Sequence, residues 1–198
     1  MVSLNFIQSA ELPTRWGTFK LHGFFDDIEK KEHIVLTLGS VSTHKPVLVR
    51  IHSECLTGDS LFSLRCDCGS QLEESMRLIA KEEVGAIVYL RQEGRGIGLL
   101  NKIKAYHLQD EGADTVEANE QLGFDPDARD YSVCESIFNH LGIVDVRLLT
   151  NNPKKVKALK DMGIVVSERL SIQTGQNPHN EAYLAVKAGK LGHLFDKD

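Results

Sequence analysis

Short apolar runs predict five β-strands along the chain. The first two runs are rich in β-branched side chains, which favour extended backbone. The third is almost continuously apolar, as is typical of a strand buried on both faces. The predicted strands cover residues 33–39, 47–52, 85–91, 144–150 and 164–169.

Apolar residues at helical spacing predict helices between these strands. Leu72, Met76 and Ile79 would share the buried face of a helix over 70–83. Further helices are predicted over 98–110, 131–141 and 153–162, with a last one after Asn180.

The alternation of strands and helices predicts an α/β fold, with a mixed β-sheet flanked by helices. No internal repeat or low-complexity linker interrupts the pattern, so residues 1–198 are expected to form a single domain. Residues 123–130 are charged and rich in turn formers, and they are predicted to form a loop.

Net charge and cysteine usage narrow the class of protein. The net charge of −5 argues against broad binding to nucleic acid or to a membrane surface. No apolar run approaches membrane-spanning length, and the first residues lack a signal-peptide pattern. The four cysteines include three that lie close together, which favours a metal site in a reducing cytoplasm over a disulfide scaffold.

Three cysteines lie in one short segment, at Cys55, Cys66 and Cys68. Residues two apart in extended backbone point the same way, so Cys66 and Cys68 can bind one ion, with Cys55 as the third ligand. Three protein ligands leave the fourth position of a zinc ion free for water or substrate, as catalysis requires. Three inert thiols, or a closed site with Cys134 as fourth ligand, are the alternatives. Cys134 fits the apolar stripe of the helix over 131–141, which favours core packing for it.

Two predicted strand-to-helix turns carry cations. Residues 91–98 (Arg-Gln-Glu-Gly-Arg-Gly-Ile-Gly) combine glycines with two arginines, and residues 150–155 (Thr-Asn-Asn-Pro-Lys-Lys) place Lys154 and Lys155 in a first helical turn. Free N–H groups at a helix start suit an anion. Lysine is unfavourable there for the helix dipole, which indicates a functional role. A plain turn in the first case, and solvated lysines in the second, remain alternatives. Arg50 and Arg65 are further cations that would partly offset the charge of three thiolates on zinc.

Long motifs in this chain closely resemble the GTP cyclohydrolase II family, whose enzymes open riboflavin biosynthesis. The residues that carry the resemblance are 50–59 with 65–69, 91–99, 114–119 and 149–155, in the family's order. The resemblance extends from about residue 10 to residue 195. Related bifunctional proteins carry an extra domain that makes dihydroxybutanone phosphate, and the length here corresponds to the monofunctional form.

The resemblance implies an activity, two metals and a set of site residues. GTP would give a diaminopyrimidinone ribosyl phosphate, formate and diphosphate, in a homodimer that uses zinc and magnesium. Cys55, Cys66 and Cys68 match the zinc ligands. Asp127 matches a proton acceptor, Arg129 a nucleophile toward the α-phosphate, and Tyr106 a residue that completes ring opening. The positions matching GTP-binding residues are Arg50, Ile51, His52, Ser53, Glu54, Gln71, Glu93, Gly94, Arg95, Thr115, Thr150 and Lys155.

Physical chemistry supports these implied roles unequally. A guanidinium stays protonated at neutral pH, so Arg129 as a nucleophile would need Asp127 to take a proton during attack. Stabilising charge on the transferring phosphoryl group is the simpler role for Arg129.

Three other functions compete with the family's reaction. A non-catalytic zinc module would need a fourth protein ligand and a basic face. A nucleobase deaminase would need Pro-Cys-x-x-Cys after a His-x-Glu element, and only the latter is present, at residues 52–54. A reaction that stops at a formylated intermediate is disfavoured by Tyr106, through the resemblance alone.

Overall fold

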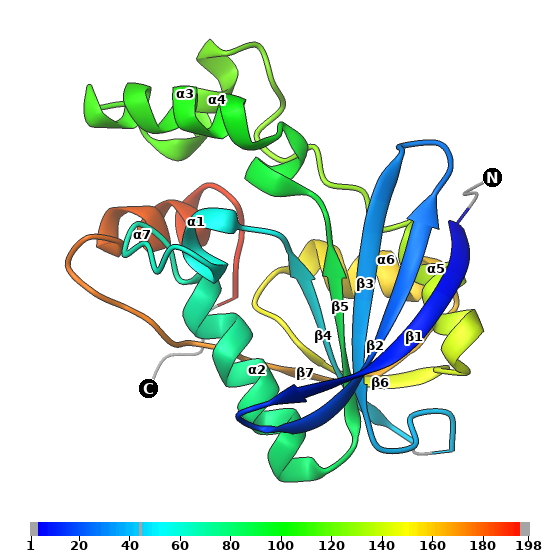
Figure 1. Cartoon of the computed structure of the whole chain (residues 1–198). Helices are drawn as coiled ribbons and strands as arrows, with labels where there is room; N and C mark the ends of the chain where they lie inside the picture. The colour runs from blue at the N-terminus through cyan, green and yellow to red at the C-terminus, as the bar shows by residue number, and fades with distance from the viewer. Residues whose placement is uncertain (1–3, 44, 195–198) are drawn as a thin grey trace.

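The computed structural model describes residues 4–43 and 45–194, and within them the strands form one seven-stranded mixed sheet. The strand order is β1-β2-β3-β5-β4-β6-β7, and helices lie on both faces of the sheet (Figure 1). The expected α/β fold with a mixed sheet flanked by helices is confirmed.

The antiparallel half of the sheet begins with a hairpin that the apolar pattern did not predict. Strands β1 (Leu4–Thr14) and β2 (Gly17–Asp26) pair with each other, and β3 (Lys31–Leu38) pairs with β2. Most of β1 is exposed, so its sequence lacks the regular alternation of a half-buried strand.

The parallel half of the sheet positions the site. It contains β5 (Gly85–Leu90), β4 (Val47–Ser53), β6 (Asp145–Leu149) and β7 (Val165–Leu170). Neighbours in this group all run in the same direction. Strand β4 lies between β5 and β6, so the chain continues from β4 to one side of the sheet and later returns to the other side. In parallel sheets of this kind, ligands bind at such a point, beyond the carboxyl ends of the strands. The predicted strands in this half are confirmed to within about two residues.

Alternate residues of β4 face two separate cores. Leu48 packs with Ile79 of α2 (Cys68–Glu82) on one face. Val49 packs on the other face with Ile137 of α5 (Val133–Leu141) and with Leu159 of α6 (Pro153–Asp161). Because Arg50 follows Val49 on the pleated strand, its side chain emerges on the α2 side.

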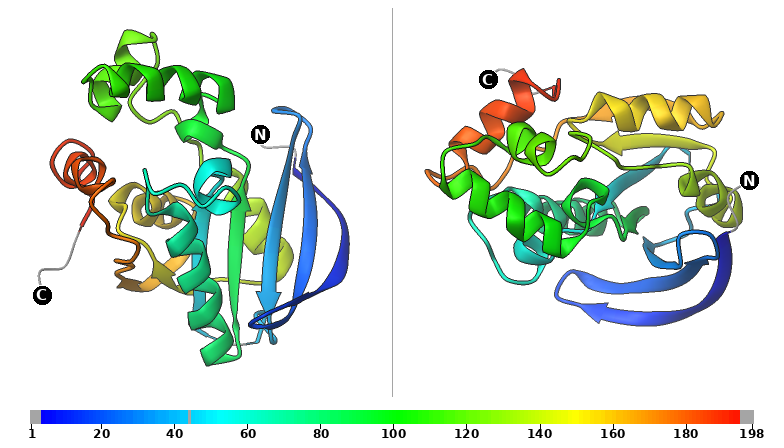
Figure 2. Two further views of the ribbon diagram at one scale, coloured as in Figure 1. Left: turned by 60° about the vertical axis from the view of Figure 1, so that its left-hand side comes forward. Right: turned by 90° about the horizontal axis from the view of Figure 1, so that it is seen from above.

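The remaining helices gather beyond the carboxyl ends of the parallel strands (Figure 2). They are α1 (Leu56–Asp59), the 3₁₀ turn η1 (Glu93–Gly96), α3 (Leu99–Asp110), α4 (Thr115–Gln121) and α7 (Glu181–Gly189). Helix α4 was not predicted, although Asp114 and Glu117 form a capping box at its start, which is a recognisable sequence signal. Among the residues described, no helix is long and apolar enough to cross a membrane.

Candidate active site

The three clustered cysteines converge as the sequence predicts. The sulfurs of Cys55, Cys66 and Cys68 all lie within 4.8 Å of one another, and the first two are 3.6 Å apart. Cys55 follows β4, and Cys68 begins α2. Cys134 instead packs in the core beside Ile137, where burial raises the pKa of its thiol to about 12. Its expected packing role is confirmed.

Two glycines allow the backbone to approach the thiol cluster closely. A Cβ on Gly58 would lie 2.8 Å from the sulfur of Cys66 and 3.2 Å from that of Cys55. A Cβ on Gly69 would lie 2.2 Å from the carbonyl oxygen of Gly58. Only glycine therefore fits at these contacts between α1 and α2. The resulting cradle of three soft sulfur donors suits a zinc ion.

A buried lysine beside the thiols was missed by sequence reasoning. The ammonium group of Lys102, on α3, lies 3.2 Å from the sulfur of Cys55 and donates hydrogen bonds to Thr57 (3.0 Å) and Glu93 (2.7 Å). Burial opposes its charge, but the charge of Cys55 and the hydrogen bond to Glu93 raise the pKa of Lys102. Lys102 is therefore a fixed cation that offsets thiolate charge, the role that the sequence suggested for Arg50 or Arg65.

Glu93 and Tyr106 lie at the thiol end of the site. Glu93 accepts hydrogen bonds from the backbone N–H of Leu56 (2.6 Å) as well as from Lys102. The hydroxyl groups of Tyr106 and Thr57 are 3.3 Å apart. Burial raises the pKa of Tyr106, so its phenol carries a proton at neutral pH.

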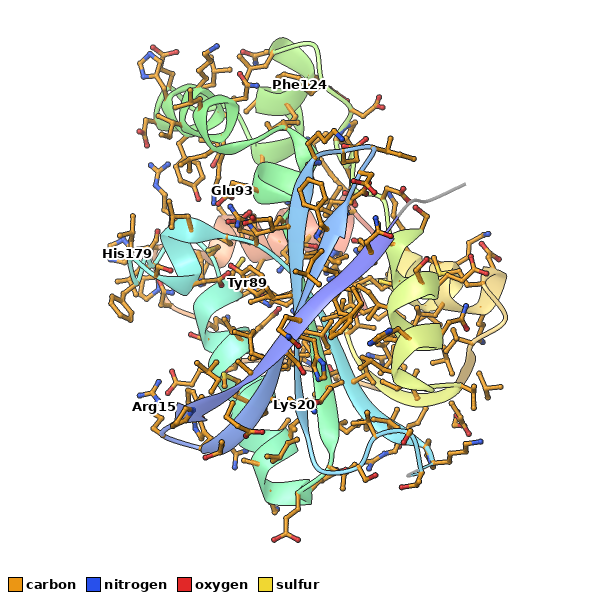
Figure 3. The ribbon with its side chains drawn as sticks, turned by 45° about the vertical axis from the view of Figure 1, so that its right-hand side comes forward. Arg15, Lys20, Tyr89, Glu93, Phe124 and His179 are labelled. Atoms are coloured by element: carbon orange, nitrogen blue, oxygen red, sulfur yellow. The ribbon has the colours of Figure 1, made fainter. Side chains whose placement is uncertain are left out.

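His52 is held by an acid that the sequence did not single out. Its Nε2 lies 3.0 Å from a carboxylate oxygen of Asp59, and its ring stacks on Tyr89. The Tyr89 hydroxyl donates to the same carboxylate (2.8 Å). Tyr89 lies on β5 and Glu93 follows that strand; both residues are labelled in Figure 3. Burial lowers the pKa of His52, which favours the neutral imidazole despite the nearby carboxylate.

Arg50 and Gln71 connect the strand end to helix α2. Arg50 donates hydrogen bonds to the side-chain oxygen of Gln71 (2.6 Å) and to the carbonyl of Leu149 (3.0 Å). Gln71 in turn donates to Asp67 (2.6 Å), which lies between two of the clustered cysteines. A hydrogen-bonded path thus joins the thiol end to the cationic end of the site.

The glycine-rich turn after β5 carries Arg95 in the left-handed region, at φ 62°, next to Gly94 at φ 64°. A residue with a Cβ is unfavourable in that conformation, and such strain is commonly found at functional sites. Arg95 donates a hydrogen bond to the hydroxyl of Thr115 at the start of α4 (3.2 Å). The turn therefore directs a cation toward the site rather than only linking strand to helix.

The turn after β6 buries one of its two lysines. Lys155 donates a hydrogen bond to the carbonyl of Ile51 (2.7 Å) and is 4% exposed, whereas Lys154 lies at the surface. Burial, followed by repulsion from Arg50 and Arg129, lowers the pKa of Lys155. The solvated alternative is therefore wrong for Lys155.

Asp127 and Arg129 form a two-pronged ion pair in the loop before α5. Arg129 donates from Nε and from one terminal nitrogen to the two carboxylate oxygens of Asp127, at 2.7 and 2.8 Å. Burial opposes ionisation of Asp127, but the hydrogen bonds and charge of Arg129 lower the pKa of its carboxyl group to about 2. The pKa of Arg129 is raised despite burial, through Tyr131 and Asp127. Both groups are thus charged at neutral pH.

These groups share one cavity, which encloses about 1080 Å³ including the part open to solvent. The three clustered cysteines, Tyr106 and Arg129 line it, as do all the positions matched to GTP binding except Ile51. Ile51 packs in the core and contributes its carbonyl to Lys155, while Asp127 lies behind Arg129. Lining residues that sequence reasoning missed include Lys102, Asn119, Asn151, Tyr183, Lys187 and His193.

Fold and cavity together define an α/β protein with a two-ended site, with thiols at one end and cations at the other. The family model described as GTP cyclohydrolase II matches residues 5–171. A protein of Azotobacter vinelandii named GTP cyclohydrolase-2 is 63% identical over 98% of this chain and 93% of its own length. A protein of the same name from Saccharophagus degradans is 62% identical over 100% of this chain and 99% of its own length. The chain belongs to the GTP cyclohydrolase II family.

A solved structure gives a weaker likeness. It is a two-domain 3,4-dihydroxy-2-butanone 4-phosphate synthase from A. baumannii, at 18% identity and a TM-score of 0.48. The match covers 86% of this chain and 40% of that one.

The ion pair of Asp127 predicts how stability depends on pH. A carboxyl group whose pKa falls from 3.8 to about 2 on folding stabilises the folded state above pH 3.8, by about 2 kcal/mol, and loses that contribution as the pH falls toward 2. We expect Asp127→Asn to lower the free energy of unfolding by about 2 kcal/mol at pH 7, and the difference from the parent to shrink below pH 4.

Urea unfolding at pH 7, 5 and 3.5 measures this difference. Asp125→Asn is the matched control, because Asp125 is exposed in the same loop. Equal effects of the two substitutions at pH 7 would contradict the assignment.

Proposed function

We propose that this protein is a zinc-dependent hydrolase that opens the imidazole ring of GTP. It would release formate and diphosphate and leave 2,5-diamino-6-(5-phosphoribosylamino)pyrimidin-4-one, the first step of riboflavin biosynthesis. One observation carries the proposal: three thiols and a group of buried cations face one cavity at the carboxyl ends of β5, β4 and β6. Membership of the family supports GTP as the substrate.

Cys55, Cys66 and Cys68 are the residues that would hold zinc. When bound there, the ion would supply Lewis-acid activation for hydrolysis at the imidazole carbon. Three thiolates leave it a formal charge of −1, and Lys102 hydrogen-bonded to Cys55 offsets that charge. The protonated phenol of Tyr106, which lies 3.3 Å from the Thr57 hydroxyl, would donate or relay a proton during ring opening.

Buried and half-buried cations make the cavity suitable for a triphosphate. Arg50 and Lys155 are buried, Arg95 and Arg129 are half-buried, and all four line the cavity. Like charges in a buried cluster repel one another, and repulsion contributes to the lowered pKa of Lys155. Phosphate oxygens placed among them would offset that repulsion. Magnesium would enter with the triphosphate, because it needs few dedicated protein ligands.

Charge stabilisation is the role that we propose for Arg129. Its two hydrogen bonds to Asp127 orient the guanidinium, and the same contacts hold its proton more firmly. A nucleophile would first have to lose that proton, whereas a charged guanidinium can stabilise a transferring phosphoryl group directly.

The family's homodimer is expected here too. Sedimentation equilibrium should then give twice the chain mass of 22.1 kDa, and a mass of one chain would contradict it.

A product assay with a thiol variant tests the proposed function. Purified protein is incubated with GTP, zinc and magnesium, and formate and diphosphate are measured separately. We expect both products from the parent protein. Cys66→Ser should abolish formate release, because it removes a zinc ligand, while some diphosphate release persists.

Cys134→Ala is the control for this assay, because the Cys134 thiol lies in the core. This variant should release both products and bind one zinc per chain, as the parent does. Absence of both products from the parent would overturn the function. Formate release by Cys66→Ser at the parent rate would overturn the zinc assignment.

Trapping experiments separate the two roles of Arg129. Parent protein and Arg129→Lys are mixed with GTP labelled at the α-phosphate, quenched in denaturant and examined for label bound to protein. Charge stabilisation predicts no labelled protein in either sample, together with diphosphate release that is slower by about 100-fold in the variant, because a lysine loses the two-pronged geometry. Label bound to the parent protein, with none bound to the Arg129→Lys variant, would show instead that Arg129 is the nucleophile.

A further inference from the structure

Helix α7 lies against the cavity although its residues follow the segment that the family model matches. Tyr183 and Lys187 of this helix line the cavity, and so does His193 just beyond it. Nothing in the sequence patterns pointed to these residues. The C-terminal part of the described chain therefore contributes side chains to the cavity.

Lys187 forms a buried ion pair with Asp67. Its ammonium group lies 2.8 and 3.0 Å from the two carboxylate oxygens. The side chains of Lys187 and Asp67 are only 10% and 3% exposed. Such a pair is costly to break from one side, because the remaining charge stays buried without a partner.

Asp67 occupies a critical position in the site. It lies between Cys66 and Cys68 in the chain, and its side chain is bonded to Gln71 and to Lys187 rather than to the backbone of the turn. These two bonds tie the segment that carries both cysteines to α2 and α7. It also accepts the hydrogen bond from Gln71, whose oxygen holds Arg50. One carboxylate thus connects the thiol turn to the cationic end, and Lys187 neutralises it.

Other contacts tie α7 and its C-cap residue Lys190 to the glycine-rich turn and to α4. The guanidinium of Arg95 lies over the ring of Tyr183, 5.8 Å from its centre. Lys190 pairs with Asp114 and Glu117, the capping-box residues of α4. The helix therefore contacts the thiol turn through Lys187, and its C-cap Lys190 contacts α4.

We propose that Lys187 is a positioning residue and that α7 is a wall of the active site. Through Asp67, Lys187 holds the Cys66–Cys68 turn in the geometry that binds metal and keeps Gln71 against Arg50. The proposal rests on the zinc-dependent function proposed above.

The negative charges near the thiol turn are the reason that we assign this role to Lys187. Zinc with three thiolates carries a formal −1, and the Asp67 carboxylate adds a second negative charge beside it. Lys102 offsets the charge of the zinc–thiolate group through its contact with Cys55, and Lys187 offsets the charge of the Asp67 carboxylate. Without Lys187, the buried carboxylate would be uncompensated and would turn away from the sulfurs or draw in water, disturbing the turn.

Three single substitutions test the role of Lys187. Lys187→Met keeps the length of the side chain and removes the charge, and Lys187→Arg keeps the charge. Ala185→Glu is the matched control, because it also lowers the charge of α7 by one, but at an exposed position. Zinc affinity is measured by competition with a chromophoric chelator, and the cobalt(II)-substituted proteins are compared by their sulfur-to-metal absorption bands.

We expect Lys187→Met to bind zinc about tenfold more weakly, to shift the cobalt bands and to lower kcat for formate release about tenfold or more, with a smaller change in KM for GTP. Lys187→Arg should recover most of the zinc affinity and activity. Ala185→Glu should match the parent. Parent-like zinc affinity and cobalt bands in Lys187→Met would overturn the proposal.

A double substitution separates positioning from direct contact with substrate. If Lys187 acts through Asp67, adding Lys187→Met to Asp67→Asn should cost little more than Asp67→Asn alone. A further rise of about tenfold in KM for GTP in the double variant would show that Lys187 binds phosphate itself, and would overturn the positioning role. Zinc affinity and the cobalt bands are measured without GTP turnover. Absence of formate from the parent would therefore refute the proposed function, and the comparison of zinc affinity between the parent and Lys187→Met would still decide the role of Lys187.

Discussion

Strand β4 lies between β5 and β6, and all three run in the same direction, so their carboxyl ends meet at one edge of the sheet. The segments that follow these strands bring Cys55, the Gly94–Arg95 turn and Lys155 to that edge from distant parts of the sequence. Neither end of the site is complete without this arrangement. The order and direction of the strands thus decide which side chains line the cavity together.

Compensation of buried charge is the second constraint on the site. Three thiolates around a zinc ion would leave one negative charge, and Lys102 of α3 lies 3.2 Å from Cys55 to offset it. Asp67, which lies between two of the cysteines, is paired in the same way with Lys187 from α7. At the opposite end, cations are gathered with less compensation, which suits an anionic ligand. The two ends therefore differ in charge balance, and that difference matches a metal site beside a phosphate site.

Sequence reasoning predicted the parallel half of the fold and the thiol cluster, because both leave local signals. Apolar runs mark β4 and β5, and the Cys66–Cys68 spacing marks a metal site. The hairpin β1–β2 was missed since an exposed strand carries little periodicity, whereas α4 had a capping box that could have revealed it. Lys102 and Lys187 could not be chosen from sequence, because the residues that give them their roles are distant in the chain. Cys55 lies 47 residues from Lys102, and Asp67 lies 120 residues from Lys187. The loop with Asp127 and Arg129 was singled out only by family resemblance.

The proposed function requires a zinc site that is made by three cysteines and has one open position. X-ray absorption at the zinc edge of the metal-loaded protein tests it most directly, because sulfur and lighter atoms scatter differently. We expect three sulfur neighbours at about 2.3 Å and one oxygen or nitrogen neighbour at about 2.0 Å. Four sulfur neighbours, or a zinc shell without sulfur, would contradict it.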